Sequence, residues 1–310
     1  MIRHALVLTA GLGTRLRPLT DVRAKPAIPV AGDAMIRRII RWLVSRSVTD
    51  LVLNLHHLPA TLTAVVGDGS DLGARVRYSW EQPAILGSAG GPRLALPLIG
   101  ADEFFIINGD TLTDVDLAAL ADRHDTSGAL VTLALVPNTE FHRYGGVVLD
   151  EAQRVTGFVP RGPGAAGSFH YIGVQIARAD VFQSLRPGDA ARTIGGIYDS
   201  LIATRPGSVG GFVIDATFFD VGTVQDYWHT TRAFERPGAD SDTSSGRAAT
   251  IDPTAHVADS ILWDDVEVGA GAVIERCIVT DGVRVPPNAA YRETILLMRD
   301  GTLEAVPITA

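Results

Sequence analysis

Residues 8–30, LTAGLGTRLRPLTDVRAKPAIPV, constrain this chain more than any other stretch. A four-residue apolar run, ALVL, ends at the first of them and is typical of a buried parallel strand. Gly11 and Gly13 then let backbone N–H groups turn toward an anion, because no Cβ stands in the way. Arg15 adds a planar fork of donors and Lys25 a mobile charge, and both suit phosphate oxygens. The stretch predicts a cradle for a polyphosphate such as a nucleoside triphosphate.

Apolar strand-like runs alternate with helix-like segments along most of the chain. The strand-like runs are residues 5–8, 51–55, 75–78, 104–107 and 130–136, and residues 35–45 carry apolar side chains at helical spacing. This alternation predicts an α/β fold, a Rossmann-like and mostly parallel sheet flanked by helices. Because such sheets bind ligands at the carboxyl ends of their strands, the glycine-rich loop should lie at the ligand site.

The composition limits the classes of partner. The chain carries 27 Lys+Arg and 35 Asp+Glu, a net charge of −8, which argues against a nucleic-acid partner. The single cysteine, Cys277, excludes an internal disulfide framework and a cysteine-rich zinc site. The first residues lack the apolar core of a signal peptide, and no apolar run approaches the roughly 18 residues of a membrane span. We therefore expect a cytoplasmic protein without a membrane partner.

The pattern of the sequence changes near residue 235. Residues 236–250 are polar and lack apolar periodicity, so we expect a linker there between a first domain, 1–235, and a second, 251–310. From Ile251 to Val285 aliphatic residues recur every five or six positions between small residues, as in a β-solenoid. Only about two coils fit, fewer than a solenoid needs to stand alone. We expect it to pack on the first domain or on another subunit, in a homo-oligomer of two or more chains; a β-hairpin tail is the alternative.

The order of residues in 11–30 resembles the signature of the sugar-1-phosphate nucleotidyltransferases, which join a nucleoside triphosphate to a sugar phosphate. The matching positions are Gly11, Gly13, Thr14, Arg15, Leu16, Pro18, Leu19, Thr20, Lys25, Pro26, Pro29 and Val30. The aliphatic repeat resembles the left-handed hexapeptide-repeat β-helix that follows some of these domains. The resemblance implies the nucleotide-diphospho-sugar transferase fold over 1–235, followed by a short left-handed β-helix.

The resemblance also implies roles for the residues of the signature. Arg15 would hold the leaving pyrophosphate, and Lys25 the α-phosphate or the incoming phosphate. The nucleotide would contact the backbone of the glycine-rich loop, at Ala10, Gly11, Gly13 and Thr14.

Two aspartates close apolar runs that resemble the metal-binding segments of the family. Asp110 ends FFIINGD, and Asp220 lies in FFDVGT. Either one alone could be a helix N-cap or a turn residue. Nucleotidyl transfer needs its phosphate charge neutralised, and Mg²⁺ held by hard oxygen ligands is the usual means. The resemblance implies Mg²⁺ at this pair, with the sugar phosphate attacking the α-phosphorus in line as pyrophosphate departs.

The segment WEQPAILGSAGG, residues 80–91, resembles the part of the family that faces the base. It would place Glu81, Gly87 and Ser88 against the nucleotide. A carboxylate can accept two N–H donors from guanine, whereas uracil or thymine offers only one imide N–H. This comparison favours GTP, although relatives that use uridine nucleotides also carry a carboxylate here.

The sugar-binding part resembles the family less closely. Tyr144, Gly145 and Gly146 resemble its sugar-binding turn, and Arg161 stands where the family places a lysine that contacts phosphate. The acid that normally precedes this lysine is missing. The segment HYIG, residues 170–173, also lacks the asparagine that often precedes its glycine. These departures leave the identity of the sugar open.

Three functions are compatible with these patterns. The favoured one joins GTP and mannose 1-phosphate, as a mannose-1-phosphate guanylyltransferase does. The second is a uridylyl- or thymidylyltransferase acting on the 1-phosphate of N-acetylmuramate, N-acetylglucosamine or glucose, because residues 67–79 also resemble the N-acetylmuramate-1-phosphate enzymes. The third is a regulatory subunit that senses a nucleotide sugar without turnover, against which the intact Arg15, Lys25, Asp110 and Asp220 count.

Overall fold

A computed structural model describes residues 2–235 and 244–308 of the chain. Its compact packing divides into two units. The first contains Met1–Gly11, Ile39–Pro59 and Val66–Asp220, and the second contains Leu12–Arg38, Ala60–Val65 and Val221–Ala310. Most of the signature segment therefore groups with the C-terminal part of the chain. Of the expected linker, residues 236–243 lie outside the described residues, and the domain boundaries stay a prediction.

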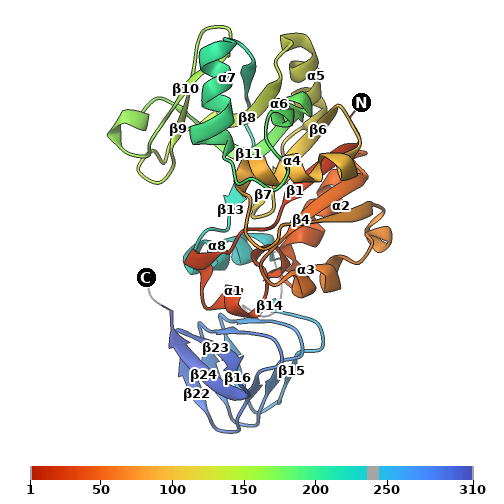
Figure 1. Cartoon of the computed structure of the whole chain (residues 1–310). Helices are drawn as coiled ribbons and strands as arrows, with labels where there is room; N and C mark the ends of the chain where they lie inside the picture. Colours follow the sequence, from red (N-terminus) through yellow and green to blue (C-terminus); the bar gives the residue numbers. More distant parts are fainter. Residues whose placement is uncertain (1, 236–243, 309–310) are drawn as a thin grey trace. The chain divides into compact units, whose positions relative to one another are not determined.

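The first unit is built on a nine-stranded sheet. Seven strands follow the order β10-β9-β11-β6-β1-β4-β5; of the other two, β8 pairs with β11 and β12 pairs with β8. Helices flank this sheet (Figure 1). Strands β1, β4, β5 and β6 are parallel to one another, β12 is parallel to β8, and β11 is antiparallel to both β6 and β8. The strands are β1 His4–Leu8, β4 Asp50–Leu55, β5 Arg75–Trp80, β6 Glu103–Asn108, β8 Val131–Pro137, β9 Gly146–Leu149, β10 Val155–Val159, β11 Phe169–Arg178 and β12 Val209–Val213.

The expected strand runs coincide with β1, β4, β5, β6 and β8, which confirms the α/β prediction. Every residue from Phe104 to Ile107 is at most 2% exposed, so both faces of the central strands are covered. Helices α4 Gly87–Ile99, α6 Asp180–Gln183 and α7 Tyr198–Thr204 share one core with Leu6 and Phe104. Helix α5, Leu117–Ser127, packs on β8, β11 and β12, and its first turn is capped by the Asp116 carboxylate, which accepts bonds from two backbone N–H groups.

Further short elements connect these strands and helices. They are β2 Pro29–Val30, β3 Asp33–Ala34, β7 Thr111–Thr113, β13 Phe218–Asp220, α1 Leu19–Val22, α2 Met35–Ser45, α3 Pro59–Val66 and α8 Val224–Phe234, with one-turn segments at Thr14–Leu16, Lys25–Ala27, Ser70–Leu72, Pro163–Ala165 and Thr193–Ile197. The helix expected at residues 35–45 is confirmed as α2. No helix within 2–235 and 244–308 is long and apolar enough to cross a membrane.

The C-terminal part of the second unit is a short parallel β-helix, as predicted. Ile261 pairs with Ile278, and Ile278 with Ile295, so that paired residues in successive coils are 17 positions apart. The coils are the blue part of Figure 1. Three parallel ladders result: β14 Ser244–Ser245, β17 Ile261–Leu262, β20 Ile278–Val279 and β23 Thr294–Arg299; β15 Thr250–Ile251, β18 Glu267–Val268 and β21 Arg284–Val285; and β16 His256–Ala258, β19 Val273–Glu275 and β22 Ala290–Arg292.

Aliphatic side chains fill the interior of these coils. Leu262, Ile274, Val279 and Leu296 are each at most 1% exposed, and the buried Cys277 packs among them. Within residues 244–308, the hairpin considered as an alternative occurs only at the end, where β24, Thr302–Pro307, pairs antiparallel with β23. The repeat spacing in the sequence therefore reflected the stacking of one aliphatic residue on the next.

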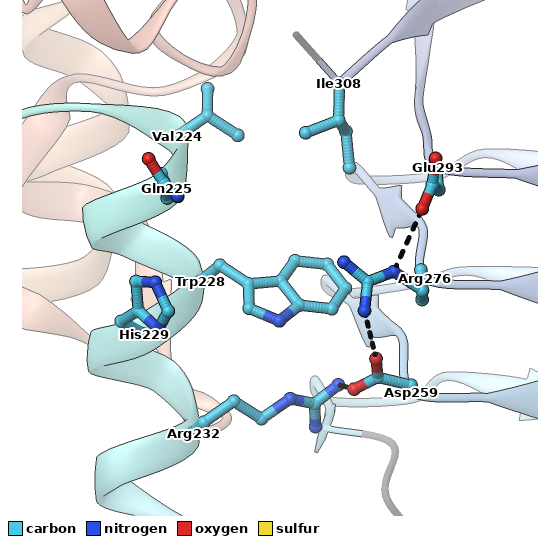
Figure 2. A pocket seen from close by; sticks show the side chains of 9 residues that line it. All are labelled: Val224, Gln225, Trp228, His229, Arg232, Asp259, Arg276, Glu293 and Ile308. Atoms are coloured by element: carbon cyan, nitrogen blue, oxygen red, sulfur yellow. Dashed lines mark hydrogen bonds and ion pairs between the residues drawn. The ribbon is translucent and has the colours of Figure 1, made fainter. Parts of the chain in front are cut away.

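Helix α8 packs beside the β-helix within the second unit. Its N-cap Thr223 and residue Asp226 form a capping box, which satisfies two of the free N–H groups at the helix start. A cavity of about 440 Å³ lies between α8 and the coils, with Trp228 directed toward it from the helix (Figure 2). The cavity is lined by Val224, Gln225, Trp228, His229, Arg232, Asp259, Arg276, Glu293 and Ile308.

Candidate active site

The glycine-rich loop folds back on itself at Gly13. This residue has φ +61°, and a Cβ there would lie 2.6 Å from Cγ2 of Thr20 and 3.2 Å from Cβ of Lys25. Thr20 Oγ1 also donates a hydrogen bond to the carbonyl oxygen of Gly13, at 3.0 Å. Only glycine fits both the conformation and the space. Lys25 therefore packs against this turn, and only 8% of its surface is exposed.

Arg15 lies in the one-turn segment Thr14–Leu16, anchored by the fully buried Leu16. Its guanidinium is exposed and lies against Gly222, since a Cβ at Gly222 would be 3.2 Å from both Nη1 and Nη2 of Arg15. Gly222 follows Asp220 by two positions in the sequence. Thr14 and Gly11 are exposed, whereas Ala10 is 3% exposed. An exposed guanidinium held at a fixed place is suited to an anionic group that arrives from solvent.

The two aspartates expected to hold metal lie at one small sheet of the first unit, Asp220 within β13 and Asp110 directly before β7. Strand β7 pairs antiparallel with β13, and Thr111 lies opposite Asp220. Asp110, the residue before Thr111, is therefore a neighbour of Asp220 across this ladder, and both aspartates are partly buried. No group of three or more His, Cys, Asp or Glu in the described ranges could hold a metal by itself. Two carboxylates fit Mg²⁺, which usually binds one or two of them together with substrate phosphates.

Glycines let the backbone close tightly around the end of β6. The N–H of Gly109 donates to the carbonyl oxygen of Leu8, at 2.9 Å, and a Cβ at Gly109 would lie 2.6 Å from that oxygen. Gly173 has φ +79°, and a Cβ there would be 2.7 Å from Nδ2 of Asn108. Strand β11 can therefore cross the end of β6 directly beside Asp110. The role of Gly173 in this packing was not foreseen from the sequence.

Glu81 is fully buried and hydrogen-bonded inside the protein. Asn54 Nδ2 donates to its Oε1 at 2.7 Å, and the N–H of Leu86 donates to its Oε2 at 2.6 Å. Asn54 in turn accepts a bond from the N–H of Thr9 at 2.6 Å, which joins Glu81 to the end of β1. A Cβ at Gly91 would overlap Glu81 Oε1. The structure thus gives this carboxylate internal partners that hold the segment after β5, and its contact with a base stays a prediction.

Sequence reasoning missed Asn54. It lies in β4 as a single polar residue in the apolar run LVLNL and is 3% exposed. A buried amide needs hydrogen-bonding partners, so this interruption was a usable signal.

The start of α4 is closed by the segment that contains Ala191 and Thr193. Gly87 has φ +74°, and a Cβ there would lie 2.7 Å from the carbonyl oxygen of Ala191. Ser88 Oγ accepts a bond from the N–H of Thr193 at 2.9 Å and lies 2.9 Å from Thr193 Oγ1. Gly87 and Ser88, both predicted to contact the nucleotide, are thus placed where this segment meets the first turn of the helix.

An aromatic cluster occupies the predicted sugar-binding part. The Tyr144 ring stacks on the His170 ring, with 4.0 Å between centroids and 26° between planes. Phe218 lies 5.3 Å from His170, and the Arg143 guanidinium lies 4.8 Å from the centre of the Tyr144 ring. Burial lowers the pKa of His170 to about 4, so its ring is neutral near pH 7. The sequence flagged position 170 only for its missing asparagine, and Phe218 was not singled out.

The other predicted sugar-site residues lie in the turns around this cluster. A Cβ at Gly145 would lie 3.0 Å from the carbonyl oxygen of Val159, and one at Gly146 would overlap the Ser168 hydroxyl. Arg161 is exposed.

Tyr171, next to His170, has a buried hydroxyl with no hydrogen-bond partner within 2–235 and 244–308. Burial raises its pKa well above the usual range, and the negative charge of Asp110 adds to this effect. The Tyr171 hydroxyl is therefore neutral and lies within the electrostatic reach of Asp110.

Comparison with known proteins agrees with this geometry. The nucleotidyl transferase family model matches residues 4–236, and the model of the GlmU-like C-terminal hexapeptide region matches residues 244–291. The chain belongs to the nucleotidyl transferase family. Both parts of the predicted resemblance, the catalytic domain and the hexapeptide region, are confirmed.

Among the relatives of this nucleotidyltransferase, the mannose-1-phosphate guanylyltransferase of Mycobacterium tuberculosis is 29% identical over 290 residues, covering 91% of this chain and 80% of the relative. The N-acetylmuramate alpha-1-phosphate uridylyltransferase of Neisseria meningitidis serogroup B is 33% identical over 222 residues, covering 71% and 93%. The fold is also that of HddC from Yersinia pseudotuberculosis complexed with GMP-PN, with a TM-score of 0.65, 22% identity, and coverage of 76% of this chain and 100% of HddC.

Proposed function

We propose that this nucleotidyltransferase joins GTP and mannose 1-phosphate to give GDP-mannose and pyrophosphate. The observation that carries the proposal is the extent of the similarity to the mannose-1-phosphate guanylyltransferase of M. tuberculosis, which spans 91% of this chain. The similarity to the N-acetylmuramate alpha-1-phosphate uridylyltransferase covers only 71% of this chain. The guanylyltransferase assignment therefore accounts for more of the molecule.

In the proposed reaction, a phosphate oxygen of mannose 1-phosphate forms a bond to the α-phosphorus of GTP. The bond from that phosphorus to the β-phosphate oxygen breaks, and the leaving pyrophosphate takes the electron pair. Arg15 would bind the pyrophosphate, because its guanidinium is exposed and placed by Leu16 and Gly222. Lys25 would bind the α-phosphate or the sugar phosphate from its packed position beside Gly13.

Mg²⁺, held by Asp110 and Asp220, would neutralise charge on the phosphates. The proposal is supported by the places of the two aspartates: Asp220 lies in β13, and Asp110 is the residue before β7, the strand that pairs with β13. The aromatic rings around His170 would offer a flat face to the sugar ring, with the Arg143 guanidinium beside Tyr144.

A second candidate function is supported by the higher identity, 33%, to the uridylyltransferase of N. meningitidis. In that case the substrates would be UTP and an amino-sugar 1-phosphate. A regulatory subunit without turnover is disfavoured because Arg15, Lys25, Asp110 and Asp220 are all present. We further propose that the protein is a cytoplasmic homo-oligomer, which size-exclusion chromatography with light scattering would test.

The deciding experiment is a pyrophosphate-release assay with Mg²⁺, pairing GTP, UTP, dTTP, ATP and CTP with the 1-phosphates of mannose, glucose, N-acetylglucosamine and N-acetylmuramate. We expect the highest kcat/KM with GTP and mannose 1-phosphate, and loss of release when EDTA is added. A preference for UTP with N-acetylmuramate 1-phosphate would establish the second candidate. No release from any pair, with nucleotide-sugar binding still measurable, would establish the regulatory subunit.

The role of Arg15 can be separated from general loop effects with a neighbour in the same loop. Arg15→Ala should lower kcat much more than it raises KM for the sugar phosphate, because the guanidinium acts on the leaving group. Arg17→Ala is the matched control: Arg17 is exposed and its ion pair, at 3.3 Å, is with Asp21. Equal losses in the two variants would contradict the leaving-group role.

A further inference from the structure

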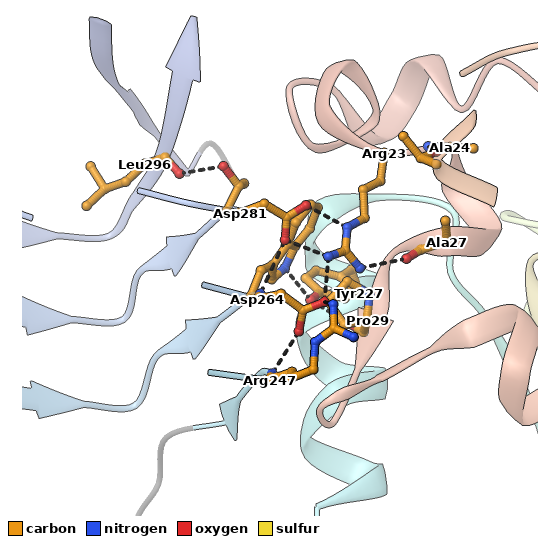
Figure 3. Close-up of polar contacts among 12 residues, drawn as sticks. Arg23, Ala24, Ala27, Pro29, Tyr227, Arg247, Asp264, Asp281 and Leu296 are labelled. Atoms are coloured by element: carbon orange, nitrogen blue, oxygen red, sulfur yellow. Dashed lines mark hydrogen bonds and ion pairs between the residues drawn. The ribbon is translucent and has the colours of Figure 1, made fainter. Parts of the chain in front are cut away.

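Arg23, two residues before Lys25, is bound by carboxylates of the β-helix. Its Nε donates to Oδ2 of Asp281 at 2.6 Å, and its Nη2 donates to Oδ1 of Asp281 and Oδ2 of Asp264, each at 2.7 Å (Figure 3). Nη1 donates to the carbonyl oxygen of Ala27 at 3.3 Å. The side chain is only 11% exposed. A bidentate, largely buried arrangement is the strong form of an ion pair and fixes the direction of the guanidinium.

The repeat of the β-helix places the two acids together. Asp264 follows β17 and Asp281 follows β20, one coil later, and the N–H of Asp264 donates to Oδ1 of Asp281 at 3.2 Å. Burial raises the pKa of Asp281, and the bonds to Arg23 offset this only in part. At Asp264 burial also acts to raise the pKa, but the bonds from Arg23 and from the N–H of Arg247 outweigh it and lower the pKa. Arg23 supplies a positive charge that compensates the neighbouring carboxylates of Asp264 and Asp281.

A second set of hydrogen bonds joins the same coil to Pro29, near the C-terminal end of the loop. Trp263, next to Asp264, is fully buried, and the Arg23 guanidinium lies 5.6 Å from its ring centre. Trp263 Nε1 donates to the hydroxyl of Tyr227 at 2.9 Å, and that hydroxyl donates to the carbonyl oxygen of Pro29 at 2.7 Å. The loop is thus held at residues 23 and 29, on both sides of Lys25.

We propose that Arg23 is a positioning residue for nucleotidyl transfer, and that the β-helix holds the phosphate-binding loop in its reactive geometry. The inference rests on the proposed function, and it assigns the hexapeptide region a part in the reaction as well as in assembly. The anchors act through Arg15 and Lys25, the two loop cations with a proposed role in the reaction. Arg23 lies between them in the sequence, and Pro29 follows Lys25. A displacement of about 1 Å in a catalytic group can cost on the order of 100-fold in rate, so small changes in the anchors are measurable.

The chain offers a matched control at another contact of the β-helix, the ion pair between Arg232 of α8 and Asp259. Arg232 Nη2 donates to Oδ1 of Asp259 at 2.6 Å, and Asp259 also pairs with Arg276, whose Nη1 is 3.6 Å from Oδ2 (Figure 2). This arginine–aspartate pair joins α8, rather than the loop, to the coils. It makes no contact with residues 23–29. Removing the charge of Asp259 therefore perturbs the β-helix without releasing the loop.

The test compares Asp281→Asn, Asp264→Asn and the control Asp259→Asn in the full-length protein by steady-state pyrophosphate release. We expect Asp281→Asn to lower kcat by about 10- to 100-fold with KM changed less than about threefold, and Asp264→Asn to act in the same direction. Asp259→Asn should stay within about twofold of the wild type in both constants. Asp281→Glu, which keeps the charge, should recover part of the lost kcat. Equal kcat values for Asp281→Asn and Asp259→Asn would overturn the proposal.

Amide hydrogen exchange provides a readout that does not depend on activity. In Asp281→Asn the amides of residues 24–30 should exchange at least about tenfold faster than in Asp259→Asn, because only the former loses an anchor of the loop. Unchanged exchange in this segment would refute the positioning role even if the enzyme is active. If the wild type releases no pyrophosphate from any substrate pair, the proposed function fails, and the exchange experiment still decides whether the β-helix holds the loop. Arg23→Lys, which keeps one donor and the charge, serves in both measurements if Asp281→Asn does not fold.

Discussion

His170 should make the protein less stable in weak acid. Its ring stacks on Tyr144 and lies 5.3 Å from the ring of Phe218, and burial lowers its pKa to about 4 from an ordinary value of 6.5. The nearby positive charge of Arg143 acts in the same direction. Because the folded protein resists protonation of this ring, the unfolded chain takes up the proton first as the pH falls. The stability contributed by the neutral ring is complete above pH 6.5 and is lost as the pH falls toward 4.

The size of the effect follows from the two pKa values. For a group that titrates at 6.5 when unfolded and about 4 when folded, lowering the pH from 7.5 to 5 costs about 2 kcal/mol of unfolding free energy. The ring is partly exposed, and solvent screening reduces this to about 1 to 2 kcal/mol. His124, buried against Thr132, has a pKa lowered by burial and adds to the trend. A His170 variant is therefore needed to isolate one group.

The assay compares urea unfolding of the wild type and His170→Phe at pH 7.5 and pH 5. Phenylalanine keeps a ring in the stack but cannot take up a proton. We expect the wild type to lose about 1 to 2 kcal/mol more than the variant over this range. A titration of the His170 Cε1–H signal by NMR, assigned by its absence in the variant, measures the pKa directly. A midpoint near 6.5, together with equal losses in both proteins, would refute the reasoning.

Three further changes test other parts of the molecule. Asp110→Asn should reduce turnover at least about 100-fold while nucleotide binding without metal, measured by calorimetry, is retained. Gly173→Ala should lower the unfolding free energy by about 2 to 4 kcal/mol in denaturant titrations, because φ is +79° and a Cβ would lie 2.7 Å from Asn108 Nδ2; Gly157→Ala, with no atom within 4 Å, is the control. Trp263→Phe should lose about 1 to 2 kcal/mol through its Nε1–H bond to α8, and an unchanged denaturation midpoint would contradict that bond.

Several expectations could be drawn from the sequence because they depend on neighbours along the chain. Residues 104–107 of strand β6 form a continuous apolar run followed by Asn108 and Gly109, a pattern typical of a buried parallel strand and the turn after it. Gly13 marked a tight turn, and its φ of +61° agrees. The aliphatic repeat indicated the β-helix because each coil must place a similar residue at the same position.

Other features of the site escaped sequence reasoning. Glu81 was predicted to face the base, and its hydrogen bonds from Asn54, 27 residues away in the chain, and from the N–H of Leu86 were not foreseen. His170 and Tyr144 come together only because β11 passes the turn before β9. Such partners are set by the pairing of strands, which single-residue patterns do not specify.

The sequence by itself indicated the family and the alternation of strands and helices, and it predicted the phosphate-binding loop and the pair of aspartates. Each of these rests on short stretches in which backbone conformation and residue chemistry are local. Tertiary structure alone decided what holds the loop. Arg23 is 258 residues from Asp281 and 241 from Asp264, whereas the acid nearest to it along the chain, Asp21, pairs with Arg17. The physical reason is that charge pairing acts through space. The ion pairs of Arg23 require two coils that place both carboxylates side by side. The anchor at Pro29 requires α8, which brings Tyr227 to Trp263.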